Sequence, residues 1–399
     1  MELKFLKRYY LLFISSTLGP LTTNALVPLY NQLKINFYLG NIAFVTLALF
    51  VYILPFAFFQ LFAGTFSDLF DKKKVVSIGY VIFIFGQFFS LSSIYLRTYP
   101  LFLLAFFFQG LGFSFINPTI LAILSILTPR KKEGLIMGIY NSSAGIGVTV
   151  GSIISGLLSL VNWRLLFIIN PIVTIISGIL FLISLNNCQQ LICRPFEGKM
   201  ENKTKKSKVL QLFSQLKKNL TKEIILLGLI GFFCFFTIIS LTSTINEQIS
   251  LSIPYLNESE ITTSVSIILT INGLISVIIS PFSGNLLNKI KPKTMMIIGF
   301  SLMLIILWLP FGFSLLHFII ISFIIYLGST FIWPALFKSS MQINKEAKGT
   351  NSAIINSLRF FGYASVPILY NFFGIPILYF FVFAFSIGAI GILIYLKVK

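Results

Sequence analysis

Residues 112–118 read GFSFINP, and residues 328–334 read GSTFIWP. Four residue types recur between these segments with an offset of 216, as Gly112, Phe115, Ile116 and Pro118 against Gly328, Phe331, Ile332 and Pro334. A second block follows each segment with an offset of 215, in which Gly134, Asn141, Ser142 and Gly147 recur as Gly349, Asn356, Ser357 and Gly362. Two blocks in the same order at nearly the same offset indicate that the chain contains two copies of one unit.

The composition around these blocks is that of a membrane protein. Of 399 residues, 56% are hydrophobic and only 10% are Asp, Glu, Lys or Arg, whereas an ordinary globular domain has about 25% charged residues. The apolar content is close to what twelve membrane-spanning helices of about 20 residues each require. Too few charged residues remain to solvate the surface of a soluble fold, so that class is excluded.

Apolar runs separated by short charged clusters predict an all-α membrane protein with twelve transmembrane helices. We expect an N-terminal six-helix bundle over 1–185, a basic cytoplasmic linker over 186–222 and a C-terminal six-helix bundle over 223–399. The predicted helices are 9–33, 40–63, 75–96, 99–127, 134–161 and 165–185, then 224–245, 261–287, 294–315, 316–337, 349–373 and 375–396. Each copy holds an even number of helices, so the two copies are parallel repeats, an architecture of transporters that bind substrate between the repeats.

The net charge of +19 follows the topology. All Lys and Arg residues except Lys34, Arg97, Arg164 and Arg359 fall on one side of the predicted membrane. By the positive-inside rule, both termini and the linker are cytoplasmic. The basic linker is then a topology signal beside anionic lipid rather than a nucleic-acid site. We expect a multi-pass, monomeric protein of the cell membrane that contacts lipid and binds no nucleic acid.

The residue types of metal and cofactor chemistry are scarce. Three cysteines form neither a disulfide framework nor a C-x-x-C site, and one histidine excludes a His-rich metal centre. We therefore expect no cofactor and no metal. A polytopic membrane enzyme would need a cluster of His, Asp or Glu at one membrane depth, and the sequence offers none.

Residues 64–75 read GTFSDLFDKKKV and resemble the loop signature G-x-L-A-D-R-x-G-R-[KR] of the major facilitator superfamily. The matching residues are Gly64, Asp68, Lys72 and Lys73, while Leu69 and Asp71 depart from the pattern. The resemblance implies that the matching residues brace the cytoplasmic side of a closed gate.

The fifth predicted helix contains Gly147-x3-Gly151-Ser-x2-Ser-Gly156, which resembles the antiporter signature G-x3-G-P-x2-G-G. Small residues at 147, 151 and 155 share one helix face and allow close helix packing. Two further segments, WRLLFIINP at 163–171 and NSLRFFG at 356–362, also resemble drug:proton antiporter families. The chain is most similar to those multidrug efflux families, although the fourth-helix Arg of their R-x-x-Q-G signature is replaced by Phe106.

The resemblance implies a secondary active transporter that exports a small-molecule substrate by alternating access, with proton-coupled drug or metabolite efflux as the finer reading. Three alternatives stay open: a facilitator, a nutrient importer of the same fold, and a polytopic membrane enzyme, the last disfavoured by the residue types.

Arg359 is the one ionisable residue predicted deep in the membrane, about 15 Å from the start of its helix. A charge at this depth should face the bundle interior, where it has a substrate or coupling role, or a structural role bonded to backbone carbonyls or an Asn. Polar or aromatic residues at middling depth complete a predicted substrate cavity of Asn24, Gln109, Asn141, Asn272, Trp333, Asn356 and Arg359. The amides could equally bond neighbouring helices, and Trp333 could pack rather than stack on a ligand.

No carboxylate is predicted at mid-membrane depth. Glu247 is about 35 Å along its helix from the cytoplasmic end, which places it at the outer interface as the coupling candidate; Asp68, or no coupling at all, is the alternative. A central Arg without central acids favours anionic, zwitterionic or neutral substrates over organic cations.

Overall fold

A computed structural model describes residues 2–69, 71–127, 133–186, 220–287, 289–343 and 348–396. Side chains near several helix ends, and that of Asn141, are not among those described. Every regular element in the described ranges is helical. In chain order these are α1 (Glu2–Leu26), η1 (Val27–Leu29), α2 (Tyr30–Asn36), α3 (Ile42–Leu69), α4 (Lys72–Leu96), α5 (Tyr99–Leu127), α6 (Glu133–Val161), η3 (Trp163–Leu165), α7 (Leu166–Asn186), α10 (Lys222–Ser252), α11 (Glu258–Leu286), α12 (Pro292–Met303), η4 (Leu304–Phe311), α13 (Leu315–Ile343) and α14 (Lys348–Tyr395).

The predicted all-α membrane fold is confirmed. Ten described helical segments are long and apolar enough to cross a membrane. The last of them, Ile354–Tyr395, has 42 residues, about twice the length one crossing needs. It bends at Gly374, whose φ of 72° is a left-handed conformation that glycine adopts without a steric penalty. The two legs of α14 are therefore the eleventh and twelfth spans, and α1 is the first.

Two predicted helices differ in detail from the structure. The first, expected to run unbroken over 9–33, ends as an α-helix at Leu26 and continues as η1 and α2, because Pro28 lacks the N–H that an interior helical position donates. The ninth changes from α-helix to the tighter 3₁₀ form at Leu304, and this segment ends at Gly312 before α13 begins.

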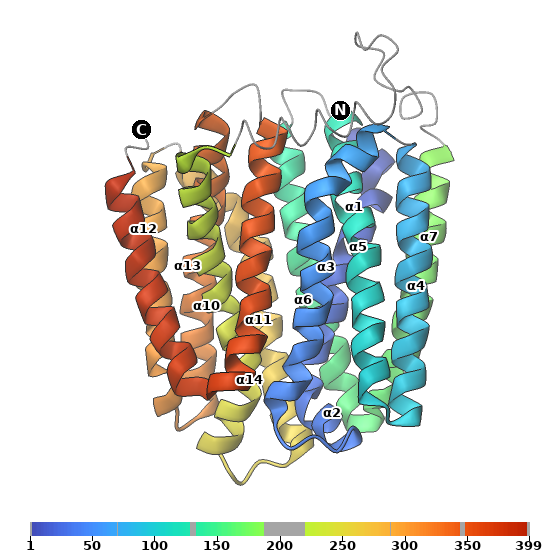
Figure 1. The fold of residues 1–399 in the computed structure, drawn as a ribbon, viewed down its shortest axis with the longest axis vertical. Helices are drawn as coiled ribbons and strands as arrows, with labels where there is room; N and C mark the ends of the chain where they lie inside the picture. The colour runs from blue at the N-terminus through green and yellow to red at the C-terminus, as the bar shows by residue number, and fades with distance from the viewer. Residues whose placement is uncertain are drawn as a thin grey trace.

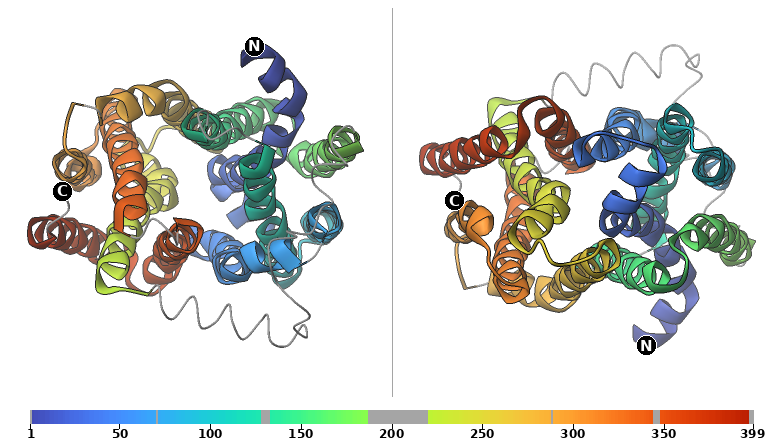
Figure 2. Two further views of the ribbon diagram at one scale, coloured as in Figure 1. Left: turned by 90° about the horizontal axis from the view of Figure 1, so that it is seen from above. Right: turned by 90° about the horizontal axis from the view of Figure 1, so that it is seen from below.

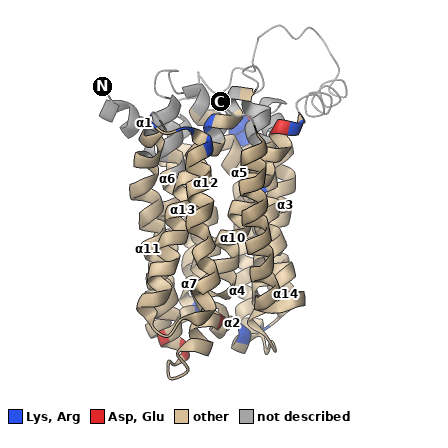
Figure 3. Cartoon of the chain, turned by 90° about the vertical axis from the view of Figure 1, so that its left-hand side faces the viewer, with Lys and Arg blue, Asp and Glu red and all other residues tan. Residues whose placement is uncertain are grey.

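The helices form two groups that lie side by side (Figure 2). We call α1–α7 the N-terminal half and α10–α14 the C-terminal half. Figure 1 shows that most helices run along the long axis and that both chain ends lie at the same end of the bundle. Figure 3 shows Lys and Arg mainly at that end, with Asp and Glu at both ends of the bundle.

The repeated segments pack alike in the two halves. A Cβ atom on Gly79 of α4 would lie 2.8 Å from the carbonyl oxygen of Gly112 on α5. A Cβ atom on Gly299 of α12 would lie 2.7 Å from the carbonyl oxygen of Gly328 on α13. Both helix pairs thus approach closely through facing glycines, which explains why the glycine of the motif recurs.

The second repeated block packs alike as well. Gly147 of α6 lies against the carbonyl oxygen of Thr17 on α1, and Gly362 of α14 lies against that of Phe232 on α10. Each glycine and its carbonyl partner recur with the same offset of 215 residues. The two halves therefore share internal packing as well as sequence.

Candidate substrate site between the two halves

The two halves meet along two helix pairs, of which α3 with α14 is the first. The hydroxyl of Ser357 donates a hydrogen bond of 3.0 Å to the carbonyl oxygen of Ala57. One turn away, the rings of Phe56 and Phe360 lie edge to face with centroids 4.7 Å apart. The face of α14 that carries these residues is thus turned toward the N-terminal half.

The second pair joins α6 to α11. A Cβ atom on Gly145 would lie 3.1 Å from the carbonyl oxygen of Gly273. Further along α6, a Cβ atom on Gly156 would lie 2.8 Å from the Cβ atom of Ser266. Because these positions carry almost no side chain, the two helices run in close contact across the boundary between the halves.

Arg359 lies at the centre of an aromatic cluster on the C-terminal side of this boundary. Its guanidinium carbon is 4.4 Å from the ring centroid of Trp333 on α13 and 4.5 Å from that of its neighbour Phe360. The ring of Phe235 on α10 is 5.0 Å away. We call Phe235, Trp333 and Phe360 the aromatic cage of Arg359. Three ring faces stabilise the partly buried cation by cation–π attraction.

The cage contains no counter-ion among the described residues. The titratable groups that interact electrostatically with Arg359 are the hydroxyl of Tyr140 on α6 and the thiol of Cys234 on α10, with no carboxylate among them. The Nε of Arg359 is buried without a hydrogen-bond partner. Tyr140 belongs to the N-terminal half, so Arg359 faces both halves of the molecule.

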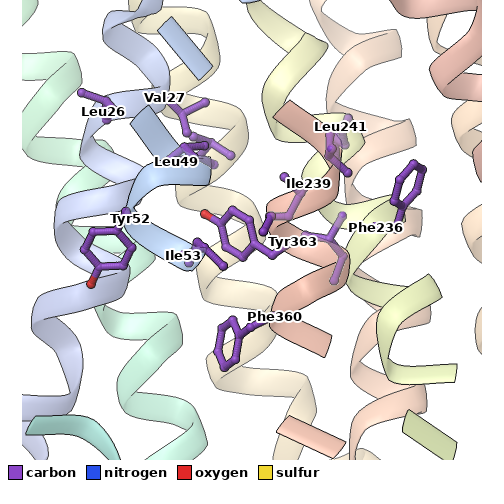
Figure 4. Packing of buried hydrophobic residues seen from close by; sticks show 14 of the residues in the cluster. Leu26, Val27, Leu49, Tyr52, Ile53, Phe236, Ile239, Leu241, Phe360 and Tyr363 are labelled. Atoms are coloured by element: carbon purple, nitrogen blue, oxygen red, sulfur yellow. The ribbon is translucent and has the colours of Figure 1, made fainter. Parts of the chain in front are cut away.

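Buried tyrosines continue the site beyond the cage. Tyr363, one turn after Arg359, extends from α14 toward Tyr52 and Ile53 of α3 (Figure 4). The hydroxyl of Tyr363 lies beside the Thr23 side chain of α1. The hydroxyl of Tyr52 is buried and has no partner. The ring of Tyr52 packs against Phe106 and Phe113 of α5, so this hydroxyl lies within the N-terminal half.

Glu247, the predicted coupling residue, pairs with a tyrosine of α14. Its carboxylate accepts a hydrogen bond from the hydroxyl of Tyr370. Nearby, the hydroxyl of Tyr379 lies 2.9 Å from that of Thr244. Glu247 is thus partnered by a residue of the same helix that carries Arg359.

Polar contacts also join the halves at the end of the bundle that carries α2. Nδ2 of Asn246 on α10 donates a hydrogen bond of 2.7 Å to the carbonyl oxygen of Val27 in η1. Nε2 of Gln32 donates to the hydroxyl of Thr262 and, over 3.3 Å, to the carbonyl oxygen of Glu258. These bonds cross from one half to the other and must break if the halves separate here.

The structure brings two of the predicted cavity residues together, Trp333 and Arg359. Asn24 bonds back to the carbonyl of Pro20, one turn earlier in its own helix. Gln109 bonds across to the carbonyl oxygen of Gly86, between α5 and α4. Both bonds suit a packing role, and contact of Asn24 or Gln109 with substrate stays a prediction.

The remaining predicted amides lie on helices of the boundary. Asn272 on α11 is fully buried, and neither atom of its amide has a hydrogen-bond partner. Asn356 lies one turn before Arg359, and its Oδ1 also lacks a partner. The side chain of Asn141 lies outside the described residues. Of the predicted amides, Asn356 is the one closest to Arg359 in the sequence.

The predicted gate motif is described only in part. The surroundings of Gly64 and Asp68 near the end of α3 are not described, and Lys72 and Lys73 open α4. The N-cap of α4 is Asp71, whose Oδ1 accepts a hydrogen bond of 2.9 Å from the backbone N–H of Lys73. The residue that departs from the family signature thus caps this helix.

The glycines of the antiporter-like motif take part in two helix–helix contacts. Cβ atoms on Gly147 and Gly151 would each lie 2.5 Å from a carbonyl oxygen of α1, those of Thr17 and Leu21. Gly156 instead faces α11 of the other half. The predicted close packing is confirmed.

Sequence reasoning named Trp333 but missed the other two rings of the aromatic cage and the tyrosines. Phe235 and Phe360 are two of 45 phenylalanines, and Tyr363 is one of 15 tyrosines, so their residue type carries no signal. A usable signal was spacing: Arg359 and Phe360 follow Asn356 by three and four residues and precede Tyr363 by four and three, so all four share one region of the helix surface.

Comparisons with known proteins identify the fold and the family. The Major Facilitator Superfamily profile matches residues 12–367. A transporter from a solved structure, a POT family protein in complex with 5-aminolevulinic acid, superposes with a TM-score of 0.75 and 15% sequence identity, covering 98% of this chain and 94% of that one. At this identity the superposition supports the fold alone.

Curated relatives are transporters rather than enzymes. The riboflavin transporter RibZ of Clostridioides difficile is 25% identical over 332 residues, which cover 73% of this chain and 69% of RibZ. The multidrug resistance protein Stp of Mycobacterium tuberculosis is 32% identical over 121 residues, 30% of this chain and 22% of Stp. An uncharacterised transporter of Schizosaccharomyces pombe is 30% identical over 113 residues, again 22% of its length. The profile match covers most of the sequence, and the chain belongs to the Major Facilitator Superfamily.

Proposed function

We propose that this protein is a secondary transporter that exports a small molecule across the cell membrane by alternating access. One observation carries the proposal: a caged, half-buried Arg359 without a described counter-ion lies where the two halves meet. A substrate held there touches both halves. Rocking of one half against the other would then expose it to each side of the membrane in turn.

The same reading assigns the domains and the topology. We take 1–185 and 223–399 as the moving bundles of a monomer and 186–222 as the linker between them. The distribution of Lys and Arg supports cytoplasmic termini. The contacts of Asn246 with Val27, and of Gln32 with Thr262, then belong to a closed extracellular gate.

Opposite charges also attract each other across this gate. Glu258 at the start of α11 faces the ammonium of Lys34 and the side-chain amide of Asn31, both on α2. Lys34 is one of the few basic residues on the extracellular side, so its position opposite Glu258 gives it a role in closing the gate. Opening toward the outside requires these contacts to break.

Export is favoured by the glycine motif of α6 and by the similarity to Stp, a multidrug resistance protein. Import is the second candidate, favoured by the longer match to RibZ, a riboflavin transporter. Flat aromatic side chains around Arg359 suit a planar compound such as riboflavin in either direction. The direction of net movement separates the two candidates.

We assign proton coupling to Glu247. Its carboxylate bonds Tyr370 of α14, so protonation of Glu247 would weaken a contact to the helix that carries Arg359. Proton binding at the gate would in this way bias the position of α14. A facilitator, by contrast, would move its substrate without regard to a pH gradient.

Transport by purified protein in liposomes tests the proposal. Riboflavin and a panel of toxic planar compounds are loaded on one side, with and without an imposed pH gradient. We expect protein-dependent movement that fails in Arg359→Ala and persists in Arg164→Ala, a matched arginine beside Trp163 on the extracellular side. In expressing cells, loss of the same compound indicates export, and accumulation indicates import. Movement of a transported compound that is unchanged in Arg359→Ala would overturn the assigned site.

A further inference from the structure

The geometry of Arg359 selects a class of ligand. A guanidinium group is a flat cation whose N–H donors lie in its plane. The rings of Trp333, Phe360 and Phe235 cover its faces with centroids 4.4 to 5.0 Å from the central carbon. Aromatic rings over the faces leave the edge of the group for hydrogen bonding, and its Nε has no partner.

The charge of Arg359 needs an anion that the described residues do not supply. A buried cation without a partner is costly in a medium of low dielectric constant. Cation–π contacts and the hydroxyl of Tyr140 offset part of this cost. A ligand carboxylate would offset more, since its two oxygens match two parallel N–H donors on one edge of a guanidinium group.

The surroundings of Arg359 select the rest of the ligand. Arg359, Trp333, Phe235 and Tyr140 are all partly accessible, and Tyr140 belongs to the N-terminal half, so the cage has an accessible side. The partly accessible groups around Arg359 are aromatic rings, which favour contact with another ring.

We propose that the substrate of this transporter is an aromatic carboxylate whose carboxylate pairs with the Nε edge of Arg359 and whose ring lies against Trp333 and Phe235. The inference rests on the proposed transport function, because it names the substrate class of the same site. It also gives the aromatic cage a purpose: the cage fixes the guanidinium plane before the ligand arrives.

Binding to the purified full-length protein tests this class. Calorimetry compares 2-naphthoate with 2-naphthamide, which has the same shape without the charge, and with decahydro-2-naphthoate, which keeps the charge without the aromatic ring. We expect 2-naphthoate to bind about tenfold or more tightly than the amide, the factor typical of a hydrogen bond to a charged group. We also expect it to bind more tightly than the saturated acid.

Variants assign the effect to Arg359. In Arg359→Gln the advantage of naphthoate over naphthamide should disappear. Arg359→Lys should keep part of it, because the charge remains while the flat pair of donors is lost. Arg164→Gln, which removes an arginine beside Trp163 outside the site, should keep all of it.

Several results would overturn the inference. These are equal binding of the acid and the amide, equal binding of the aromatic and saturated acids, an advantage that survives in Arg359→Gln, or no binding of naphthoate. If Arg359→Gln does not fold, the substrate class is tested by the binding of the three ligands to the unaltered protein and to the Arg359→Lys variant. Liposome transport separates the two proposals. If the protein moves a neutral or cationic compound and shows no preference for naphthoate, only the proposed substrate class is wrong. If naphthoate binds but no compound moves, the proposed transport function is wrong.

Discussion

The guanidinium carbon of Arg359 lies 4.4 Å from the centroid of the Trp333 ring. The two residues come from different helices of the C-terminal half, α14 and α13, and sit on the side that faces the N-terminal half. Their contact sets the plane of the cation and thereby the direction in which its N–H groups can donate.

Replacing Trp333 tests the importance of this contact. Trp333→Leu should weaken binding of 2-naphthoate about 2- to 30-fold, which corresponds to the roughly 0.5–2 kcal/mol of a cation–π contact. Trp333→Phe should weaken it less, because a ring remains. Calorimetry on purified protein measures both. Trp308→Leu is the matched control, since Trp308 is 61% exposed on η4; an equal loss in that variant would contradict the assignment.

Glycine packing between α1 and α6 predicts a stability effect. A Cβ atom on Gly147 would lie 2.5 Å from the carbonyl oxygen of Thr17, so Gly147→Ala forces the helices apart. We expect a loss of about 1–3 kcal/mol, the usual cost of overpacking, seen as a lower Tm in detergent. Gly391→Ala on α14 is the control, because nothing lies within 4 Å of its added atom. Equal Tm values for both variants would refute the packing argument.

The hydrogen bond between Asn246 and Val27 predicts an effect on the population of molecules whose proposed extracellular gate is open. Asn246→Ala removes the bond of 2.7 Å to the carbonyl oxygen of Val27. A buried hydrogen bond contributes about 1 kcal/mol, so the open population should rise roughly fivefold. Hydrogen–deuterium exchange over residues 27–36 measures the opening. Gln87→Ala, which removes a bond of 3.3 Å to Thr22 within one half, should leave exchange there unchanged.

The proposed role of Glu247 predicts how the transport rate responds to a pH gradient. If its protonation drives transport, Glu247→Gln should bind substrate normally yet move it at a rate independent of the imposed pH gradient. Liposome flux at several gradients measures this. Glu260→Gln is the control, because Glu260 is a gate-side carboxylate that accepts a hydrogen bond of 2.8 Å from the backbone of Asn257. A gradient response that persists in Glu247→Gln would assign coupling elsewhere.

Sequence alone determined the fold class and the repeat. Apolar runs predict helices because backbone groups must bond internally in lipid, and the recurrence of Gly112 as Gly328 reflects identical helix packing in both halves. It also singled out Arg359, because a charge in an apolar helix has few harmless explanations. The ends of α1 at Leu26 and of α12 at Met303 were not predicted. A proline does not by itself mark a helix end, because Pro20 lies inside α1 whereas Pro28 lies just beyond it.

Only the tertiary structure decided which residues each side chain contacts. The cage around Arg359 draws Phe235, Trp333 and Phe360 from three helices, and no local pattern distinguishes a ring that faces a cation from one that faces lipid. Likewise, the structure places Gln109 between α4 and α5 and joins Asn246 to Val27 across the boundary. The physical reason is general: hydrophobic patterning states which residues enter the membrane, whereas the direction each side chain faces is set by which helices pack together.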